Sequence, residues 1–319
     1  MTAGAGSVAY RDVRTVLVVG AGAIGTSWAA HLLRQGLDVV LADPDRPALE
    51  RARTLAAAFI EEGDGPADTL DHLTTTTEVE ACAPAADLVI EAGPEVLDVK
   101  RDLFGRLDSL TGVDVLLTSS SSGLPPSSFA GAAGRHPERV LVAHPFNPPH
   151  LVPLVELVGA PTTAEGALRA ADAFFTGVGK KCITLRTELP GHVVNRLQAA
   201  LWREAYDLVG RGVVSVADID TAIAWGPGLR WALLGPFATQ HLSGGAGGIA
   251  HILEHLGPPT VEWWKDLGDP SLTSDLRGAI VAGMTEEMDT IAQDEDGLRA
   301  RRDAALRGLI RAKEEAGLP

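Results

Sequence analysis

Two side chains in the middle of the chain are of types suited to proton transfer. His144 follows the apolar run Arg139–Ala143, which is typical of a strand, and imidazole accepts and returns protons near neutral pH. Glu156 lies inside another apolar run, Leu154–Val158, and a buried carboxylate normally has a polar partner. The proline-rich turn between them lets the two segments fold back, so we expect Glu156 to bond and orient His144 as a general base. The alternatives are a histidine that bonds the backbone at a strand end and a glutamate that faces solvent.

Further polar residues are candidates for holding a substrate. A run of serines, Ser119–Ser122, follows the predicted strand Val113–Thr118, and Asn195 lies near the start of a predicted helix. Hydroxyl and amide groups can bind a substrate oxygen, although serines also bond the backbone of loops and a lone asparagine is common on helix surfaces. Arg230, or alternatively Arg196, could receive a substrate carboxylate through a bidentate fork. A structural ion pair is the alternative for either arginine.

Near the N-terminus, an apolar run leads into a glycine-spaced turn. The predicted strand Val16–Val19 precedes the turn, the predicted helix Thr26–Arg34 follows it, and the turn itself reads Gly20-Ala21-Gly22-Ala23-Ile24-Gly25. In this pattern the glycines allow a tight turn, close approach to a pyrophosphate and close packing of helix on strand. Asp43 follows the next predicted strand, where an acid binds ribose hydroxyls and disfavours a 2′-phosphate. We therefore predict an NAD site at Gly20, Gly22, Ala23, Ile24, Gly25 and Asp43. The alternative for Asp43 is a loop aspartate that caps the next helix.

The order of the elements predicts the fold that must position these residues. From Val16 to Leu185, strand-like runs alternate with helical ones, which predicts a Rossmann-type doubly wound, mostly parallel α/β sheet. After it only helical patterns follow, so we predict an all-helical C-terminal domain. The expected domains are residues 1–188 for NAD binding and 189–319 for the substrate site and dimerisation. The helices predicted there are Gly191–Gly210, Ala217–Trp225 with Ser215 as its cap, Gly247–His255, Ser274–Gln293 and Glu295–Glu315, and Gly226-Pro227-Gly228 and Gly235-Pro236 are predicted interruptions.

Composition excludes several classes of partner. The 319 residues carry a formal net charge of −15, which argues against nucleic acid and an anionic membrane as partners. The two cysteines, Cys82 and Cys182, fit neither a disulfide framework nor a metal site, so we predict no metal. The segment Met1–Arg11 lacks the apolar core of a signal peptide, and no apolar run is long enough to span a bilayer. We therefore expect a cytoplasmic protein.

The chemistry-bearing motifs together resemble the 3-hydroxyacyl-CoA dehydrogenase family over nearly the whole chain. The resemblance rests on Gly20–Gly25, Glu91–Glu95, His144–Pro148 and Val194–Arg196. It implies an NAD-dependent dehydrogenase in which His144 is the base, Glu156 its partner, and Asn195 a substrate contact. The serine that contacts substrate and nicotinamide aligns with Ser122, or alternatively with Ser121. The cofactor-contacting positions of the family align with Glu95, Lys100 and Asn147.

Within the family, the chain is similar to the lambda-crystallin, L-gulonate 3-dehydrogenase and L-carnitine dehydrogenase branch. The segments that carry this are His144–Glu156 and Gly226–Trp231. The resemblance implies oxidation of the L-3-hydroxyl of a small, free hydroxy acid, and a homodimer formed through the helical domain. The alternatives are a 3-hydroxyacyl-CoA or carrier-bound substrate and a non-catalytic, NAD-binding structural protein. No lysine lies between Asp43 and Lys100, which disfavours a CoA phosphate, and His192 stands where family members often carry an aromatic residue.

Overall fold

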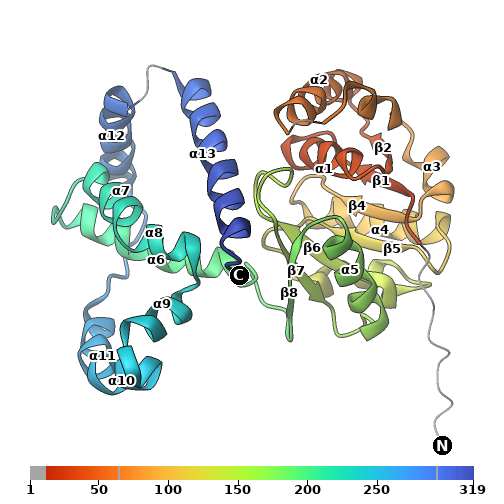
Figure 1. The fold of residues 1–319 in the computed structure, drawn as a ribbon. Coiled ribbons are helices and arrows are strands. Elements are labelled where there is room, and N and C mark those ends of the chain that lie inside the picture. The colour runs from red at the N-terminus through yellow and green to blue at the C-terminus, as the bar shows by residue number, and fades with distance from the viewer. Residues whose placement is uncertain (1–11, 64, 292–293) are drawn as a thin grey trace, which may run out of the picture. The chain divides into compact units, whose positions relative to one another are not determined.

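The computed structural model describes residues 12–63, 65–291 and 294–319, so the segment Met1–Arg11 lies outside the described part. The chain divides into two compact units, one that ends at Arg196 and one from Leu197 to Pro319. We call them unit 1 and unit 2 (Figure 1). The domain boundary predicted from the sequence lies between residues 188 and 189, before this division, and it remains a proposal.

Unit 1 is built on an eight-stranded sheet in the order β3-β2-β1-β4-β5-β6-β7-β8. All neighbouring strands are parallel except β6 and β7, which are antiparallel. The predicted doubly wound, mostly parallel sheet is therefore confirmed. The strands are β1 Thr15–Val19, β2 Asp38–Ala42, β3 Leu73–Thr76, β4 Leu88–Glu91, β5 Leu116–Ser119, β6 Val140–Pro145, β7 Leu154–Gly159 and β8 Lys181–Leu185.

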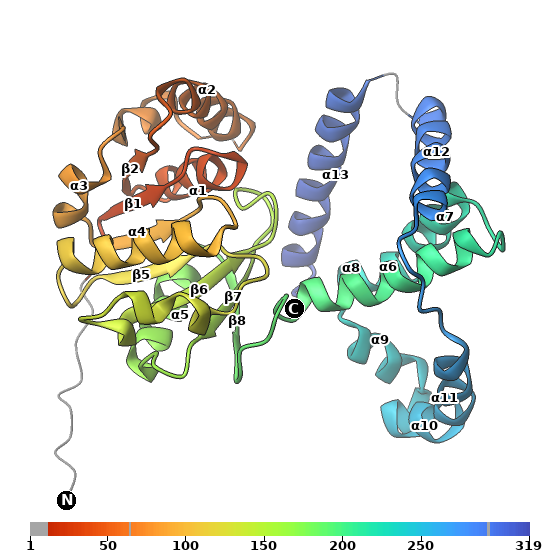
Figure 2. The same cartoon turned by 180° about the vertical axis from the view of Figure 1, so that it is seen from behind.

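Helices cover both faces of this sheet. On one face, α1 (Ala23–Arg34), α2 (Arg46–Glu62) and α5 (Glu165–Gly177) pack Trp28, Leu49 and Phe175 into one apolar core. On the other face, α3 (Val79–Cys82) and α4 (Leu97–Leu110) pack residues such as Phe104 into a second core. Figures 1 and 2 show the two faces in turn. Burial on both faces explains why the strands read as continuous apolar runs.

The sheet brings distant parts of the sequence to one edge. Strands β1, β4, β5 and β6 are parallel, so their carboxyl ends lie at the same edge, where ligands bind in such sheets. These ends carry the glycine turn, Glu91, the serine run and His144. The reversal of β7 then returns Glu156 to the same edge, opposite His144 in the register.

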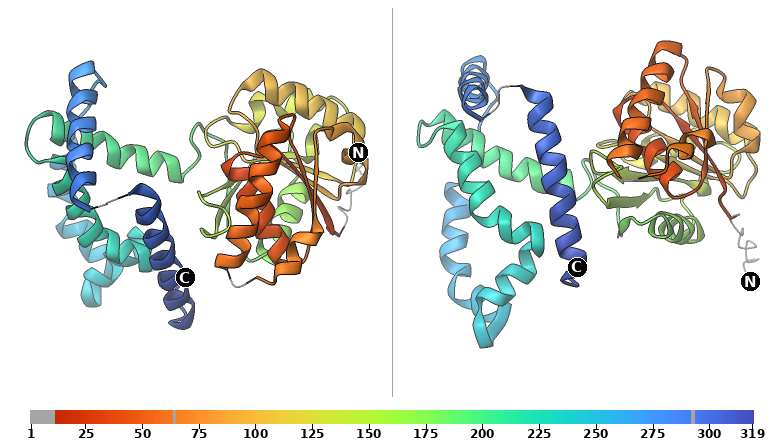
Figure 3. Two further views of the ribbon diagram at one scale, coloured as in Figure 1. Left: turned by 90° about the horizontal axis from the view of Figure 1, so that it is seen from above. Right: turned by 45° about the horizontal axis from the view of Figure 1, so that its top comes forward.

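The secondary-structure elements in the described part of unit 2 are all helices (Figure 3). Its helices are α6 Val194–Gly210, which begins in unit 1, α7 Val216–Trp225, α8 Pro227–Leu233, α9 Pro236–Ser243, α10 Gly248–His255, α11 Gly257–Asp266, α12 Ser274–Ile291 and α13 Glu295–Glu315. The predicted cap of α7 is confirmed, because the Ser215 side chain accepts from the N–H of Asp218 in a capping box. No helix in the described ranges is long and apolar enough to cross a membrane.

One predicted helix start is wrong, and three helices were not predicted. The helix expected from Gly191 begins at Val194, because Gly191 and His192 have φ angles of +75° and +50°, which a right-handed helix excludes. The interruption expected at Gly226-Pro227-Gly228 is present at Gly226, where α7 ends, but the chain becomes helical again at Pro227. The helices that were not predicted are α8, α9 and α11. Both α8 and α11 carry proline in the first turn, where its missing N–H has no consequence. The predicted end of α12 at Gln293 lies outside the described residues.

Candidate active site

His144 and Glu156 form a buried pair at the end of β6. Nδ1 of His144 lies 2.8 Å from Oε2 of Glu156, and both side chains are buried. Because the carboxylate accepts, Nδ1 carries the proton and Nε2 is the bare acceptor of the neutral ring. The pairing predicted from the sequence is therefore present in the structure, and it holds His144 in the tautomer that a general base requires.

Glu156 is bonded through both carboxylate oxygens. Oε1 accepts the backbone N–H groups of Val193 and Val194, at 2.9 and 3.1 Å, where α6 begins. Burial opposes ionisation of Glu156, but the hydrogen bonds from His144 and from these two N–H groups outweigh it and hold its pKa below the usual range. Glu156 is therefore a carboxylate at neutral pH, fixed from two sides.

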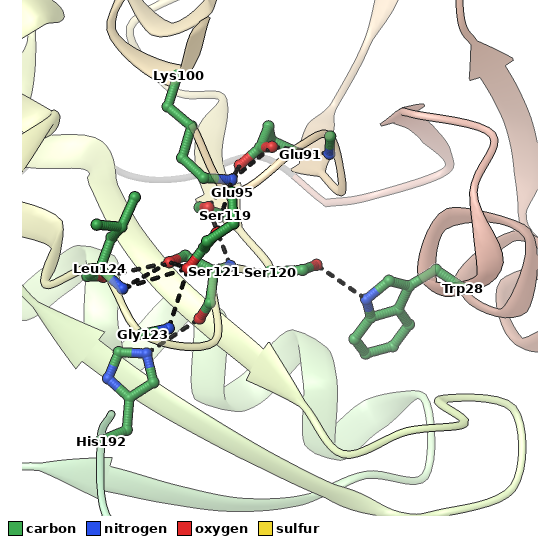
Figure 4. A network of polar contacts seen from close by, with 11 residues as sticks. Trp28, Glu91, Glu95, Lys100, Ser119, Ser120, Ser121, Gly123, Leu124 and His192 are labelled. Carbon is green, nitrogen blue, oxygen red and sulfur yellow. Dashed lines mark hydrogen bonds and ion pairs between the residues drawn. The ribbon is translucent and has the colours of Figure 1, made fainter. Parts of the chain in front are cut away.

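The loop after β5 separates the two candidate serines. We call residues 119–123 the serine loop. Ser121 is buried and its hydroxyl donates to Oε1 of Glu95 at 2.6 Å, whereas Ser122 is exposed. The same Glu95 oxygen accepts the N–H groups of Gly123 and Leu124, at 3.0 and 3.3 Å (Figure 4). The Ser121 hydroxyl is thus used to hold the loop, which leaves Ser122 as the better candidate for a substrate contact.

Asn195 lies in the first turn of α6 and reaches the serine loop. Its Nδ2 donates to the backbone carbonyl of Ser122 at 2.8 Å. A side-chain amide has two protons to donate, so one of them is committed to the loop. The structure therefore brings Ser122 and Asn195 together, while their contacts with a substrate remain predictions.

A buried ion pair that the sequence analysis did not identify lies behind the serine loop. Nζ of Lys100 lies 2.8 and 2.9 Å from the two carboxylate oxygens of Glu91, and 3.3 Å from Glu95. Ser119 Oγ and the Gly93 N–H also donate to Glu91, at 2.5 and 2.8 Å (Figure 4). Lys100 is fully enclosed, so it positions the serine loop and the loop after β4. The sequence offered a signal, because Glu91 is a carboxylate in an apolar strand, as Glu156 is.

The glycine turn has the shape that a dinucleotide needs. Gly20 has a φ of +111°, and a Cβ on Gly25 would lie 1.8 Å from the Gly20 carbonyl oxygen, so neither position accepts another residue. A Cβ added to Gly22 would meet nothing within 4 Å. There is therefore open space before the N-terminus of α1 for a pyrophosphate. The carboxylate of Asp43 accepts the Ala21 N–H at 2.7 Å and lies at the edge of this space.

A cavity of about 640 Å³ runs from the glycine turn to α4. Its lining comes from the ends of β1, β2 and β4 and from the exposed face of α4, and includes Gly20, Gly22, Asp43, Glu91 and Val99. A cavity of this size at the carboxyl edge of the sheet fits an adenosine and its phosphates. The residues present therefore fit a nicotinamide dinucleotide.

The remaining predicted residues are placed as follows. Asn147 is exposed just beyond β6, in a cis peptide bond with Pro148. Arg196 donates to the Pro190 carbonyl at 3.4 Å. Arg230 is exposed on α8 in unit 2. Among the described residues neither arginine has a carboxylate partner, and the substrate roles of Arg196 and Arg230 remain predictions.

Comparison with known proteins agrees with this geometry. The model of the 3-hydroxyacyl-CoA dehydrogenase NAD-binding domain matches residues 15–188, and the model of the C-terminal domain of the same family matches residues 191–275. An L-carnitine dehydrogenase from Streptomyces griseus is 45% identical over 310 residues, which is 95% of this chain and 91% of the relative. A 3-hydroxyacyl-CoA dehydrogenase from Gibberella moniliformis is 40% identical over 316 residues, which is 96% of each chain.

A solved structure extends the likeness to the fold. The NAD⁺-dependent 5-formyl-3-hydroxy-2-methylpyridine 4-carboxylic acid 5-dehydrogenase, described as a dismutase, superposes with a TM-score of 0.79 at 28% identity, over 95% of this chain and 99% of its own. Fold, glycine turn, His–Glu pair and sequence similarity over both parts of the chain therefore agree, and the protein belongs to the 3-hydroxyacyl-CoA dehydrogenase family.

Proposed function

We propose that this protein oxidises the L-3-hydroxyl group of a small, free hydroxy acid to the 3-keto acid, reversibly. The observation that carries the proposal is the buried His144–Glu156 pair, which leaves Nε2 of His144 as an acceptor at the edge of the sheet where the cofactor cavity opens. NAD, when bound, accepts the hydride from the hydroxyl-bearing carbon. Nε2 of His144 takes the hydroxyl proton in the same direction.

The other side chains hold the reactants. Glu156 fixes the His144 ring and stabilises the imidazolium formed in oxidation. Ser122 and the second amide proton of Asn195 hold the substrate oxygen on which negative charge develops. The glycine turn and Asp43 bind the dinucleotide, Asn147 contacts it beyond β6, and Glu95 and Lys100 shape its binding surface by holding the serine loop.

L-Carnitine is the first substrate to test, because relatives that match nearly the whole chain are named for it. It is a free 3-hydroxy acid with a quaternary ammonium group. Arg230 or Arg196 would receive its carboxylate through a bidentate contact. The exposed Trp202, Trp225 and Trp231 are candidates for a cation–π contact with the ammonium group.

A panel of substrates read by NADH absorbance tests the proposal. We expect NADH formation with L-carnitine or another free L-3-hydroxy acid, no activity with the D-enantiomer, and a lower KM for NAD than for NADP because of Asp43. The relative named 3-hydroxyacyl-CoA dehydrogenase supports one second candidate, a CoA thioester. Turnover of an L-3-hydroxyacyl-CoA with no turnover of the matching free acid would replace the first proposal with the second.

We also infer a homodimer formed through unit 2. In the described part of unit 2, only the glycines 244, 248 and 268 are buried. Large apolar side chains are exposed instead, among them Trp225, Phe237, Leu242, Trp263, Trp264 and Val281. Exposed apolar surface on this scale is typical of an interface, and a second copy supplies the same surface by symmetry. Light scattering should give twice the chain mass at micromolar concentration, and a monomer there would contradict this inference.

A further inference from the structure

Residues 191–195 donate hydrogen bonds to three successive carbonyl groups of the serine loop. Nε2 of His192 lies 3.0 Å from the carbonyl oxygen of Ser121, Nδ2 of Asn195 lies 2.8 Å from that of Ser122, and the N–H of Gly191 lies 3.2 Å from that of Gly123. The peptide groups on both sides of Ser122 are therefore held from this segment. Figure 4 shows His192 reaching the loop from the side opposite Lys100.

The bond to Ser121 fixes the tautomer of His192. A backbone carbonyl can only accept, so Nε2 donates and Nδ1 is bare in the neutral ring. Burial lowers the pKa of His192. The bond to Ser121 raises this pKa and the nearby His144 lowers it, and the net effect is a lowered pKa. The ring is therefore neutral near pH 7. Nδ1 is buried and has no hydrogen-bond partner among the described residues.

Two features make His192 an unfavourable choice for packing alone. An unpaired buried acceptor is destabilising, and a phenylalanine ring would fill the same space without one. His192 also has a φ of +50°, and it is the one non-glycine residue in the described ranges with a positive φ, a conformation that glycine adopts without strain. The Nε2–H donor is what neither phenylalanine nor glycine supplies.

His192 also lies beside the base. Its ring centre is 5.2 Å from that of His144, with the planes inclined at 46°. The next two residues, Val193 and Val194, donate their N–H groups to the Glu156 carboxylate that holds His144. One short segment therefore touches the proton acceptor, its carboxylate partner and the serine loop.

We propose that His192 is a positioning residue that sets the distance between His144 and Ser122. Its Nε2–H orients the peptide group that leads into Ser122, while its ring packs against the His144 ring. The proposal rests on the proposed function, because it takes His144 as the base and Ser122 as a substrate contact.

Two substitutions at this position separate positioning from packing. His192→Phe keeps an aromatic ring but removes the donor, and we expect kcat/KM for the hydroxy acid to fall about tenfold, as for one lost hydrogen bond. The KM for NAD should change little, and so should the melting temperature, because the loss of the bond to the Ser121 carbonyl is offset by removal of the unpaired Nδ1. His192→Gln carries an amide N–H near the position of Nε2, so it should recover kcat/KM to within about threefold of the wild type.

Equal kcat/KM in His192→Phe and the wild type would overturn the proposal, and so would a glutamine variant no better than the phenylalanine variant. A wild type that forms no NADH with any hydroxy acid would instead refute the proposed function. Long-range ¹H–¹⁵N NMR of the wild type is independent of activity and of the folding of the variants. It should show His192 with a protonated Nε2 and a bare Nδ1 at pH 7, and the opposite tautomer would exclude the bond to Ser121.

Discussion

The two units of the chain differ in the residues that they bury. Unit 1 encloses charged groups, several of them in the pairs Glu91–Lys100, Asp108–Arg139 and His144–Glu156. Unit 2 encloses only glycines among its described residues, and its tryptophans and leucines are exposed. A soluble helix normally turns such residues toward a core, so unit 2 lacks most of the apolar contacts that it needs.

The difference indicates where chemistry and association reside. Buried, paired charges fix side chains within a fraction of an ångström, as catalysis requires, but they make unit 1 sensitive to the loss of either partner. The exposed apolar side chains of unit 2 instead make its stability depend on association with another apolar surface. Single substitutions should therefore impair unit 1 by disrupting its interior and unit 2 by changing its assembly.

Removal of the base should have the largest effect. His144→Ala eliminates the proton acceptor, and we expect kcat to fall by about 10²- to 10⁴-fold. The dissociation constant for NAD, measured by fluorescence titration, should stay within about twofold, since the glycine turn is not changed. The oligomeric state should stay the same, since unit 2 is not changed. Retained turnover with lost NAD binding would move the chemistry away from His144.

Removal of one partner of a buried pair should come next. Lys100→Met leaves the enclosed Glu91 carboxylate without its cation, and we expect the free energy of unfolding of unit 1 to fall by about 3–5 kcal/mol, measured by urea denaturation. The matched control is Lys265→Met in unit 2, whose 2.7 Å pair with Glu262 is exposed and should contribute less than about 1 kcal/mol. Equal losses in the two variants would remove the contrast between the units.

Polar substitutions on unit 2 should act on assembly. Trp263→Ser combined with Trp264→Ser removes two exposed rings, and we expect the dimer dissociation constant from analytical ultracentrifugation to rise about tenfold or more. The control is Leu55→Ser, which alters an exposed apolar residue of unit 1 and should leave the constant unchanged. A dimer that tolerates the double substitution would place the interface elsewhere.

The features that follow from local pattern were predictable from the sequence. The glycine turn, the alternation of strands and helices, and the pairing of Glu156 with His144 depend on residue type and spacing over short stretches, and the structure contains them. The same reasoning could have predicted the buried ion pair of Glu91. Its carboxylate in an apolar strand demanded a partner, and Lys100 lies on the next helix.

Other features depend on contacts that a sequence pattern does not reveal. The helical periodicity from Gly191 gave no sign of the positive φ of His192, whose side chain bonds Ser121 in a distant loop. The helix α11 was not predicted, although its prolines lie in the first turn, where proline is common. The helical patterns of unit 2 predicted α6, α7, α10, α12 and α13 but not α8, α9 and α11. Amphipathic periodicity is also the same whether the apolar stripe faces a core or a second chain.

A change of pH should act on unit 1 through Lys180, a buried cation held by backbone instead of a carboxylate. Its Nζ donates to the carbonyl groups of Pro149 and Val152 and lies 5.1 Å from the centre of the Trp28 ring. Burial lowers its pKa from 10.5 to about 7. Between these values the unfolded chain binds a proton that the folded chain does not, so the free energy of unfolding should rise with pH in this window, by at most about 1.4 kcal/mol per unit.

Urea denaturation at several pH values from 7 to 10 measures that slope. Lys180→Met should flatten it, because the side chain no longer titrates. The control Lys181→Met changes the exposed neighbour and should leave the slope unchanged. Lys180 lies in unit 1, so the slope should belong to the unfolding of unit 1. A slope that persists in Lys180→Met would mean that the Lys180 ammonium is not a buried charge, and the contrast between the units would then rest on the paired groups only.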